Sequence, residues 1–366
     1  MVCGSRCLIQ MPDPIDWVFA RKVANRLSGT DSFSGSYHAT SLEPDFAEFT
    51  AQAEELVAHE TGLASLVGPA RAKVATRQEW VEANIRSFQR LFKPISEKLG
   101  EKITGPLAPA ARRFAGAEVG TLLGWMSKRV LGQYDLMIAP DDNPLEQDVV
   151  YYVGPNVLSL EKRFGFPPRE FRLWLALHEV THRAQFTGVP WMREHYVGLV
   201  NTTISAADAD PKRFMEAIKR AIDEIRGGRN PLDDGGIPSL IAGPEQRRAI
   251  EAVGGLMSLL EGHGDVTMDR AGGALVPSSE RFSRVLSQRR AEVRGMARLV
   301  RQLLGIEAKM RQYEQGEAFI AHIERERGRG FLDRVWIAPD RLPSLAEIRE
   351  PALWVTRMER PVLLSS

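Results

Sequence analysis

Two histidines and a glutamate in the segment HEVTH have the residue types and spacing that suit metal-assisted chemistry. His178 and His182 are four residues apart, so on a helix their imidazoles project from the same side, one turn apart. That arrangement suits two nitrogen ligands of one tetrahedral zinc ion. Glu179 follows the first histidine and can lie beside the ion without binding it. There it would take a proton from a zinc-activated water and pass it to a leaving amine.

The sequence around HEVTH predicts a buried helix over residues 169–187. The preceding segment FRLWLAL is apolar on nearly every side. Pro167 and Pro168 precede the helix, and Gly188 and Pro190 mark its end. The competing interpretation is a structural helix in which two buried histidines make ordinary hydrogen bonds.

A catalytic zinc ion usually has three protein ligands, so two histidines are not enough. The metzincin pattern HExxHxxGxxH is absent, because Gly188 falls at the wrong position and His195 lies too far beyond His182. The third ligand must therefore come from a distant segment.

The segment MSLLEGHGDVTMD at 257–269 is the best source of that ligand. Glu261 ends an apolar helical run, and Asp265 follows four residues later. This spacing resembles the thermolysin-like gluzincins, in which a glutamate on a second helix binds zinc and an aspartate orients the first histidine. By that analogy Glu261 is the third ligand, and Asp265 accepts the other N–H of His178.

His263 is the alternative third ligand. Positions 261 and 263 of a helix point about 200° apart, so only one of the two side chains can face the ion. Gly262 and Gly264 weaken the helix and keep His263 in consideration. A further interpretation makes Glu261 a solvated carboxylate at a helix end.

The residue that would stabilise a developing oxyanion is not specified by any motif. Tyr196, His195 and Tyr313 are candidates on position alone, and each is more often a packing or surface residue. The glycine-rich and proline-rich stretch 227–243 is predicted to be a loop that could cover a site.

Most of the chain is predicted to be helical from apolar residues at helical spacing. The small residues of one candidate helix would allow a neighbouring helix to approach closely. Two short β-prone runs indicate neighbouring strands of a small sheet, and the second could receive an extended peptide at its edge, although its Tyr151-Tyr152 pair favours sheet packing. The predicted helices are 45–60, 71–92, 108–132, 169–187, 191–206, 211–226, 244–261, 279–304 and 307–328, and the predicted strands are 134–140 and 148–154.

Composition excludes several other classes of protein. The net charge is +1 at pH 7, which gives no general attraction to nucleic acid or acidic lipid. No apolar stretch is long enough to span a membrane and no secretion signal is found, so a cytoplasmic protein is expected. Cys3 and Cys7 are expected to be free thiols, phosphate-binding glycine loops are absent, and the basic run 281–301 is expected to be a solvated helix face.

The chain resembles the zincin-like metallopeptidases of actinobacteria that are described as coenzyme F420 biosynthesis-associated proteins. The resemblance covers nearly the whole chain and is carried by long segments. It implies a mainly α (α+β) zincin-like fold, a helical bundle with a small sheet beside the HExxH helix. It carries over His178, Glu179 and His182, and Glu261 only by analogy with gluzincins. The segments are IDWVFARKVANRL (15–27), RQEWVEANIRSFQRL (77–91), GWMSKRVLGQYDL (124–136), LWLALHEVTHRAQFTGVPWMREH (173–195) and SLLEGHGDVTMD (258–269).

We therefore expect one zincin-like unit over 1–366, with a helical region at 1–133 and the metal-site region at 134–366. The expected function is a zinc-dependent metallopeptidase or amidohydrolase with one Zn2+ per chain and a peptide or protein substrate. The alternative is a catalytically silent, zinc-stabilised binding or assembly protein associated with F420-related metabolism. A weaker third interpretation is a partner-binding protein without metal.

Overall fold

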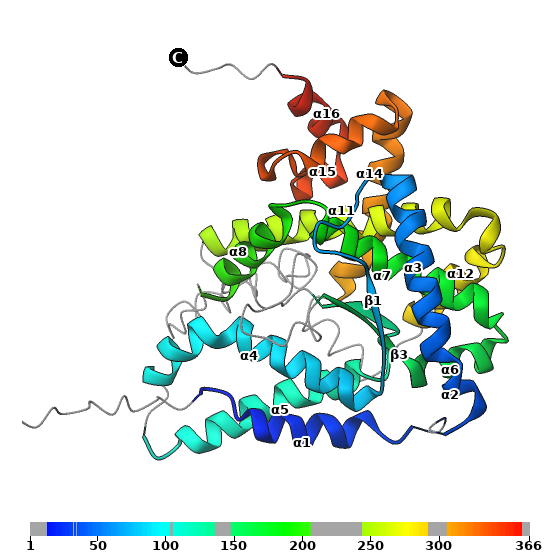
Figure 1. Ribbon diagram of the computed structural model, residues 1–366. Coiled ribbons are helices and arrows are strands. Elements are labelled where there is room, and N and C mark those ends of the chain that lie inside the picture. The colour runs from blue at the N-terminus through cyan, green and yellow to red at the C-terminus, as the bar shows by residue number, and fades with distance from the viewer. Residues whose placement is uncertain are drawn as a thin grey trace, which may run out of the picture.

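The structure, a computed structural model, describes residues 13–31, 33, 35–102, 105–135, 148–205, 244–291 and 306–360 (Figure 1). The predicted helix 211–226, the predicted loop 227–243, residues 136–140 and 292–304, and both cysteines lie outside these ranges. The elements are helices α1 (Trp17–Ser28), α2 (Tyr37–Thr40), α3 (Leu42–Thr61), α4 (Arg77–Lys102), α5 (Ala108–Met126), α6 (Gly154–Phe164), α7 (Pro168–Thr187), α8 (Met192–Ser205), α11 (Pro244–Gly272), α12 (Ser279–Ala291), α14 (Ile306–Arg327), α15 (Leu345–Arg349) and α16 (Pro351–Glu359), the 3-10 helices η2 (Gly273–Leu275), η3 (Arg329–Trp336) and η4 (Pro339–Arg341), and strands β1 (Arg71–Ala75), β2 (Gly132–Tyr134) and β3 (Val149–Val153).

The described part of the chain is mainly helical with one small sheet, as the sequence predicts. Helices α3, α7, α8 and α14 closely match their predicted ranges. The predicted helix 108–132 ends earlier, at Met126, and the predicted helix 244–261 continues to Gly272. The helices that were not predicted are α1, α2, α6, α15 and α16. No helix within the described ranges combines the length and the apolar character needed to cross a bilayer.

The three strands lie in the order β1-β3-β2. β2 pairs antiparallel with β3, with Tyr134 opposite Val150. Of the predicted strand 134–140 only Tyr134 belongs to β2, and residues 136–140 lie outside the described ranges. β1 pairs parallel with β3. The prediction that 148–154 offers an edge to a peptide was wrong, because β3 is the central strand and is paired on both sides.

The beginning of the predicted helix 71–92 was also wrong, since residues 71–75 form β1. The helix starts after Thr76, whose hydroxyl accepts a hydrogen bond from the Glu79 N–H (3.1 Å), while the Glu79 carboxylate accepts from the Thr76 N–H (2.7 Å). This reciprocal pair of bonds is a capping box, a strong start signal for a helix. The residues before it are therefore available to pair with β3.

Both faces of β3 are covered, and its residues alternate between two layers of helices. Val150 and Tyr152 belong to the core formed with α3, α6, α7 and α11. Tyr151 faces the opposite side and packs with residues of β1 and α4. The ring of Tyr152 stacks on Phe46, with centroids 3.9 Å apart. The tyrosine pair therefore serves sheet packing, as the sequence favours.

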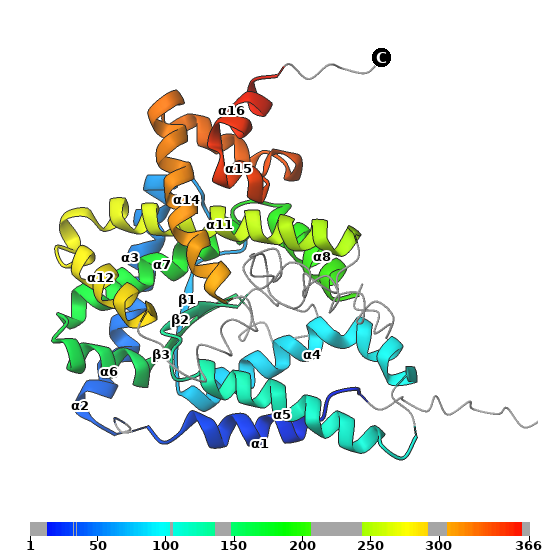
Figure 2. The ribbon, with the colours of Figure 1, turned by 180° about the vertical axis from the view of Figure 1, so that it is seen from behind.

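Helices α1 and α5 lie side by side at one end of the molecule, with α4 next to them (Figures 1 and 2). Three glycines of α5, spaced by four residues, face α1. A Cβ atom on Gly120 would lie 2.4 Å from the Ala20 carbonyl oxygen, and one on Gly116 would lie 2.4 Å from the Asp16 carbonyl oxygen. The backbones are thus in direct contact, which confirms that the small residues permit close approach.

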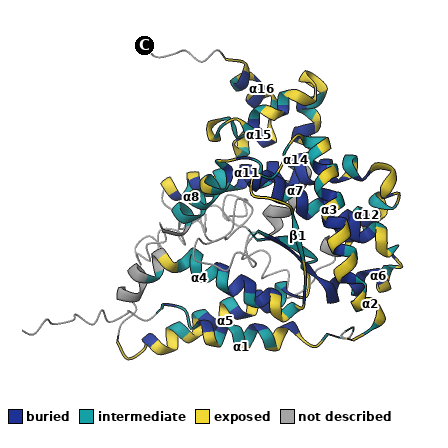
Figure 3. Cartoon of the chain, in the orientation of Figure 1, coloured by how far each residue is buried: buried dark blue, intermediate teal, exposed yellow. Residues whose placement is uncertain are grey.

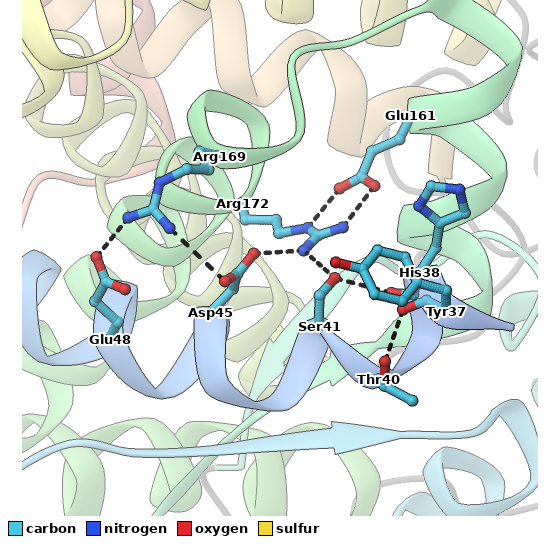
Figure 4. A network of polar contacts seen from close by, with 9 residues as sticks. All are labelled: Tyr37, His38, Thr40, Ser41, Asp45, Glu48, Glu161, Arg169 and Arg172. Atoms are coloured by element: carbon cyan, nitrogen blue, oxygen red, sulfur yellow. Dashed lines mark hydrogen bonds and ion pairs between the residues drawn. The ribbon is translucent and has the colours of Figure 1, made fainter. Parts of the chain in front are cut away.

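A buried ionic network fixes the first half of α7 against α3 and α6 (Figure 4). The guanidinium of Arg172 makes a bidentate contact with Glu161, at 2.8 and 2.9 Å, and also donates to Asp45 and Ser41. Arg172 is almost fully buried. Burial of a charge is costly unless its hydrogen bonds are satisfied, and here carboxylates on two other helices satisfy them. The network therefore holds the helix that carries HEVTH.

The C-terminal elements α14, α15 and α16 gather at the opposite end of the molecule from α1 and α5 (Figure 2). They form a second core around Phe319 and Trp354, which packs on one side of α11. Helix α14 crosses α11 where two glycines meet, because a Cβ on Gly262 would lie 2.4 Å from the backbone of Gly316. In the described part of the predicted basic face, Arg281 and Arg284 are exposed, as expected for a solvated helix face, and Arg281 also donates to the carbonyl oxygens of Phe164 and Gly165.

Candidate metal centre

The HEVTH segment lies in the second half of α7, within the main core of the protein. From Phe171 onward every residue of this helix except the two histidines is buried, and Figure 3 colours most of the helix as buried. His178 and His182 retain partial exposure, at 22% and 16% of their side chains. Glu179 is buried on the same helix. The two histidines are therefore the members of the motif that reach a partly open surface.

Glu261 joins the two histidines from the middle of α11. Its Oε2 atom lies 3.5 Å from Nε2 of His182 and 4.0 Å from Nε2 of His178. The two Nε2 atoms lie 3.3 Å apart. The three residues form a group that could hold a metal ion, since all their ligand atoms fall within 4.8 Å of one another.

This donor set fits zinc. Two ligands bound at about 2.0 to 2.1 Å and at a tetrahedral angle are separated by about 3.3 Å, which is the spacing of the two histidine nitrogens. Two imidazole nitrogens and one carboxylate oxygen leave a fourth tetrahedral position for a water or a substrate, as in catalytic zinc sites.

Helix α11 runs without interruption through Gly262 and Gly264. Glu261 and Asp265 therefore share a face, as the sequence predicts for a continuous helix. Oδ1 of Asp265 lies 3.7 Å from Nδ1 of His178, which is slightly longer than a direct hydrogen bond. A Cβ on Gly264 would lie 3.4 Å from Cε1 of His182, so this glycine leaves room for the imidazole rings.

The carboxyl group of Glu179 lies against strand β2. The backbone N–H of Tyr134 donates a hydrogen bond to it. Burial and the negative charge of Glu261 raise the pKa of Glu179 to about 7, although His182 and the Tyr134 hydrogen bond oppose this rise. A carboxyl group with a pKa near neutrality can accept and release protons under ordinary conditions.

Strand β2 is in turn anchored to α7 through Arg183, the residue after the second histidine. Arg183 donates to the carboxylate of Asp148 at 2.6 and 3.0 Å and to Glu54 at 2.7 Å. The hydroxyl of Tyr134 donates to the same Asp148 at 3.1 Å. Asp148 has a positive φ of 52°, a strained conformation for a residue other than glycine. These contacts fix strand β2, whose Tyr134 N–H donates to the carboxyl group of Glu179.

His263, the alternative third ligand, lies away from the cluster of ligand atoms. Its Nδ1 atom lies 3.0 Å from Nε2 of Gln185, and its ring meets Trp336 edge to face at 5.0 Å. Complete burial, reinforced by the charges of His182 and Arg270, lowers the pKa of His263 to about 4. The geometry thus favours Glu261 over His263 as the third metal-ligating residue.

Comparisons with known proteins agree with this geometry. Residues 15–355 match the family described as zincin-like metallopeptidase. The chain belongs to the zincin-like metallopeptidase family. It also matches a crystal structure described as "a putative hydrolase with a novel fold from Chloroflexus aurantiacus", with 32% sequence identity, a TM-score of 0.67, and coverage of 95% of this chain and 99% of that chain. The search of curated proteins gave no match.

In this zincin-like protein the electrostatics of His182 depend on the third member of the cluster. Burial lowers the pKa of His182, but the hydrogen bond and negative charge of Glu261, with a further contribution from Glu179, raise it to about 9. Without an ion, His182 is therefore in its doubly protonated, positively charged form at neutral pH. A metal ion would replace that proton as the positive charge between the carboxylates.

Two of the three oxyanion candidates can be placed. Tyr196 packs edge to face on Phe186, with centroids 5.5 Å apart, and burial together with the charge of Glu261 raises its pKa. His195 packs on Trp191. The side chain of Tyr313 lies outside the described residues. Tyr196 is thus the candidate with an electrostatic link to the cluster.

Sequence reasoning missed two residues that contact the site. Gly132 lies against Glu179, and no local pattern marks it, because its role depends on a strand that meets α7 only in the folded chain. Gln185 contacts His182, with Oε1 3.0 Å from Nδ1. Its position three residues after His182 places it on the same side of the helix, which was a usable signal.

Proposed function

We propose that this zincin-like protein is a zinc-dependent hydrolase that cleaves peptide or amide bonds. His178, His182 and Glu261 would hold the ion, and Glu179 would act as general base. The observation that supports this proposal is the convergence of three metal-binding side chains from α7 and α11 beside a buried carboxyl group. The family match supports the same chemistry.

Zinc, when bound, would lower the pKa of a coordinated water and polarise the substrate carbonyl. The remaining steps belong to residues of the chain. Glu179 would accept the proton of the attacking water and deliver it to the leaving nitrogen. In the metal-free protein, burial and the charge of Glu261 already raise the pKa of this carboxyl group to about 7, so the fold of the chain favours proton uptake at this position. The Tyr134 N–H would hold the carboxyl group in place during the transfer.

Asp265 would orient His178 from the side opposite to the ion. Its carboxylate lies on the Nδ1 side of the ring, while Nε2 faces Glu261. An acceptor at Nδ1 favours the tautomer whose Nε2 lone pair is free for a metal. Tyr196 is the side chain that we propose for stabilising the oxyanion.

The decisive experiment compares the wild-type protein with Glu179→Gln. The variant should keep one zinc per chain and lose cleavage of a peptide library by about 100-fold or more, since general base catalysis alone contributes on that order. Glu55→Gln, at an exposed position of α3, is the matched control and should cleave as the wild type does. Undiminished cleavage by Glu179→Gln would overturn the mechanism.

The same measurement distinguishes an active hydrolase from the catalytically silent alternative. A zinc-stabilised binding or assembly protein would retain zinc in both forms and cleave nothing in either. A link to coenzyme F420 metabolism, an origin in actinobacteria and a cytoplasmic location stay predictions of the sequence.

A further inference from the structure

Gln185 connects the two helices that carry the proposed metal ligands. It lies on α7 and is fully buried, at 0% exposure. Its Oε1 atom lies 3.0 Å from Nδ1 of His182, and its Nε2 atom donates to the carbonyl oxygen of Leu260 at 2.9 Å. Leu260 directly precedes Glu261 on α11. One amide group therefore contacts one histidine of the cluster and the backbone beside the glutamate.

The Leu260 carbonyl determines which way this amide points. A carbonyl oxygen can only accept, so the NH2 group of Gln185 must face Leu260. The amide oxygen then faces His182, and because that oxygen also can only accept, Nδ1 of His182 must carry a proton. In the neutral imidazole this leaves the lone pair on Nε2, the atom that lies 3.5 Å from Glu261.

We propose that Gln185 is a positioning residue that fixes the tautomer of His182 and holds it in register with Glu261 for zinc binding. This inference rests on the proposed function, because it assigns a role toward the same ion. It differs from the role of Asp265, which concerns the other histidine.

The second N–H of the Gln185 amide explains the placement of His263. It points to Nδ1 of His263 at 3.0 Å, so that nitrogen is an acceptor. The His263 ring packs against Trp336 of η3, whose carbonyl oxygen accepts a hydrogen bond from the indole N–H of Trp191 (3.1 Å). The amide is thus held at both of its N–H groups and cannot rotate to present nitrogen to His182.

The first test measures zinc affinity by competition with a chromophoric chelator. Gln185→Met keeps nearly the same volume and removes every polar contact of the amide. We expect zinc affinity to fall by about 10- to 100-fold, the usual effect of losing a partner of a metal-binding histidine. The absorption spectrum of the cobalt-substituted variant should also differ from that of the wild type, since the orientation of one ligand ring is released.

Gln246→Met is the matched control. Gln246 is also a buried glutamine, and its amide donates to the Thr203 carbonyl oxygen at 2.7 Å, but it lies near the start of α11, four turns before Glu261. This variant should lose comparable stability and bind zinc as the wild type does. Equal zinc affinities in a folded Gln185→Met variant and the wild type would overturn the inference and leave the proposed function intact. Absence of zinc binding in the wild type would overturn both.

The second test needs no variant at position 185. In zinc-loaded wild-type protein labelled with 15N-histidine, long-range 1H–15N correlation should show His182 protonated at Nδ1 and bound to zinc through Nε2. His182 is assigned from single histidine substitutions. Zinc bound through Nδ1 of His182 would overturn the inference even if Gln185→Met failed to fold.

Discussion

Gly132 touches the carboxyl group of Glu179, and the contact leaves no room for a side chain. A Cβ atom on Gly132 would lie 2.6 Å from both Cγ and Oε1 of Glu179. Glycine at this position therefore lets strand β2 approach the proposed general base closely enough for the Tyr134 N–H to bond to it.

Gly132→Ala should displace Glu179 by roughly 1 Å, and such a shift can lower turnover by about 100-fold. Zinc affinity should change little, because the atoms nearest to the added methyl group all belong to Glu179, which is not one of the proposed ligands. The measurement is kcat on a peptide that the wild type cleaves, together with zinc content. Gly198→Ala on α8 is the control, since nothing lies within 4 Å of its added methyl group. Full activity in Gly132→Ala would show that the close approach is not needed.

Zinc affinity should increase with pH between 7 and 9. In the metal-free protein His182 keeps its second proton, and therefore a positive charge, in this range. The reason is that interaction with Glu261 outweighs burial and raises the pKa of His182 to about 9. Zinc must displace that proton, so affinity should rise by about tenfold for each pH unit and level off above 9. Chelator competition at several pH values tests this, with the chelator's own protonation taken into account. Calorimetry in two buffers should also show about one proton released. A flat profile would contradict the assigned proton.

The metal-free protein should lose stability as pH rises from 7 to 9. The folded pKa of His182, about 9, exceeds its ordinary value of 6.5, so the folded state keeps a proton that the unfolded chain releases. The stabilisation is complete below 6.5 and disappears as pH passes 9. Urea unfolding of chelator-treated protein at pH 7 and pH 9 measures the effect. Zinc-loaded protein is the control and should lack this decrease, since zinc keeps His182 neutral.

The two arginines in Figure 4 should differ greatly in their contribution to stability. Arg172→Met leaves the buried carboxylate of Glu161 without its bidentate partner, and breaking such a pair costs about 3 to 5 kcal/mol. Arg169→Met removes an ion pair with Glu48 in which both side chains are more than half exposed, and a longer contact of 3.8 Å with Asp45. Pairs made by so exposed an arginine contribute about 0 to 1 kcal/mol. Denaturant unfolding of both variants measures the difference. Similar losses would contradict the buried-network interpretation.

Local sequence patterns predicted the elements that carry the cluster. A proline before α7, a second proline at its first position, a glycine after it and a mostly apolar sequence gave the bounds of the helix. The spacing of Glu261 and Asp265 required a continuous helix, and α11 provides it. The glycines that made this helix doubtful have a tertiary reason, because Gly262 meets α14 and Gly264 faces the histidine rings.

Features that depend on distant partners were not predictable in the same way. The segment 71–75 alternates polar and apolar residues over only four positions, which is too short to identify a strand by itself, and its pairing with β3 makes it one. The capping box of Thr76 and Glu79 was a local signal for the boundary and was overlooked. The order of strands in the sheet, which makes β3 central, follows from packing between segments far apart in the chain.

The division of the cluster between α7 and α11 has a consequence for folding. Helix α7 alone brings together two histidines, whereas Glu261 arrives only when two segments far apart in the chain have docked. Contacts between such distant segments form late, because closing the intervening chain costs entropy before the contact stabilises it. The complete set of ligands therefore exists only in the native protein. Zinc added during refolding should leave the folding rate almost unchanged and slow unfolding instead.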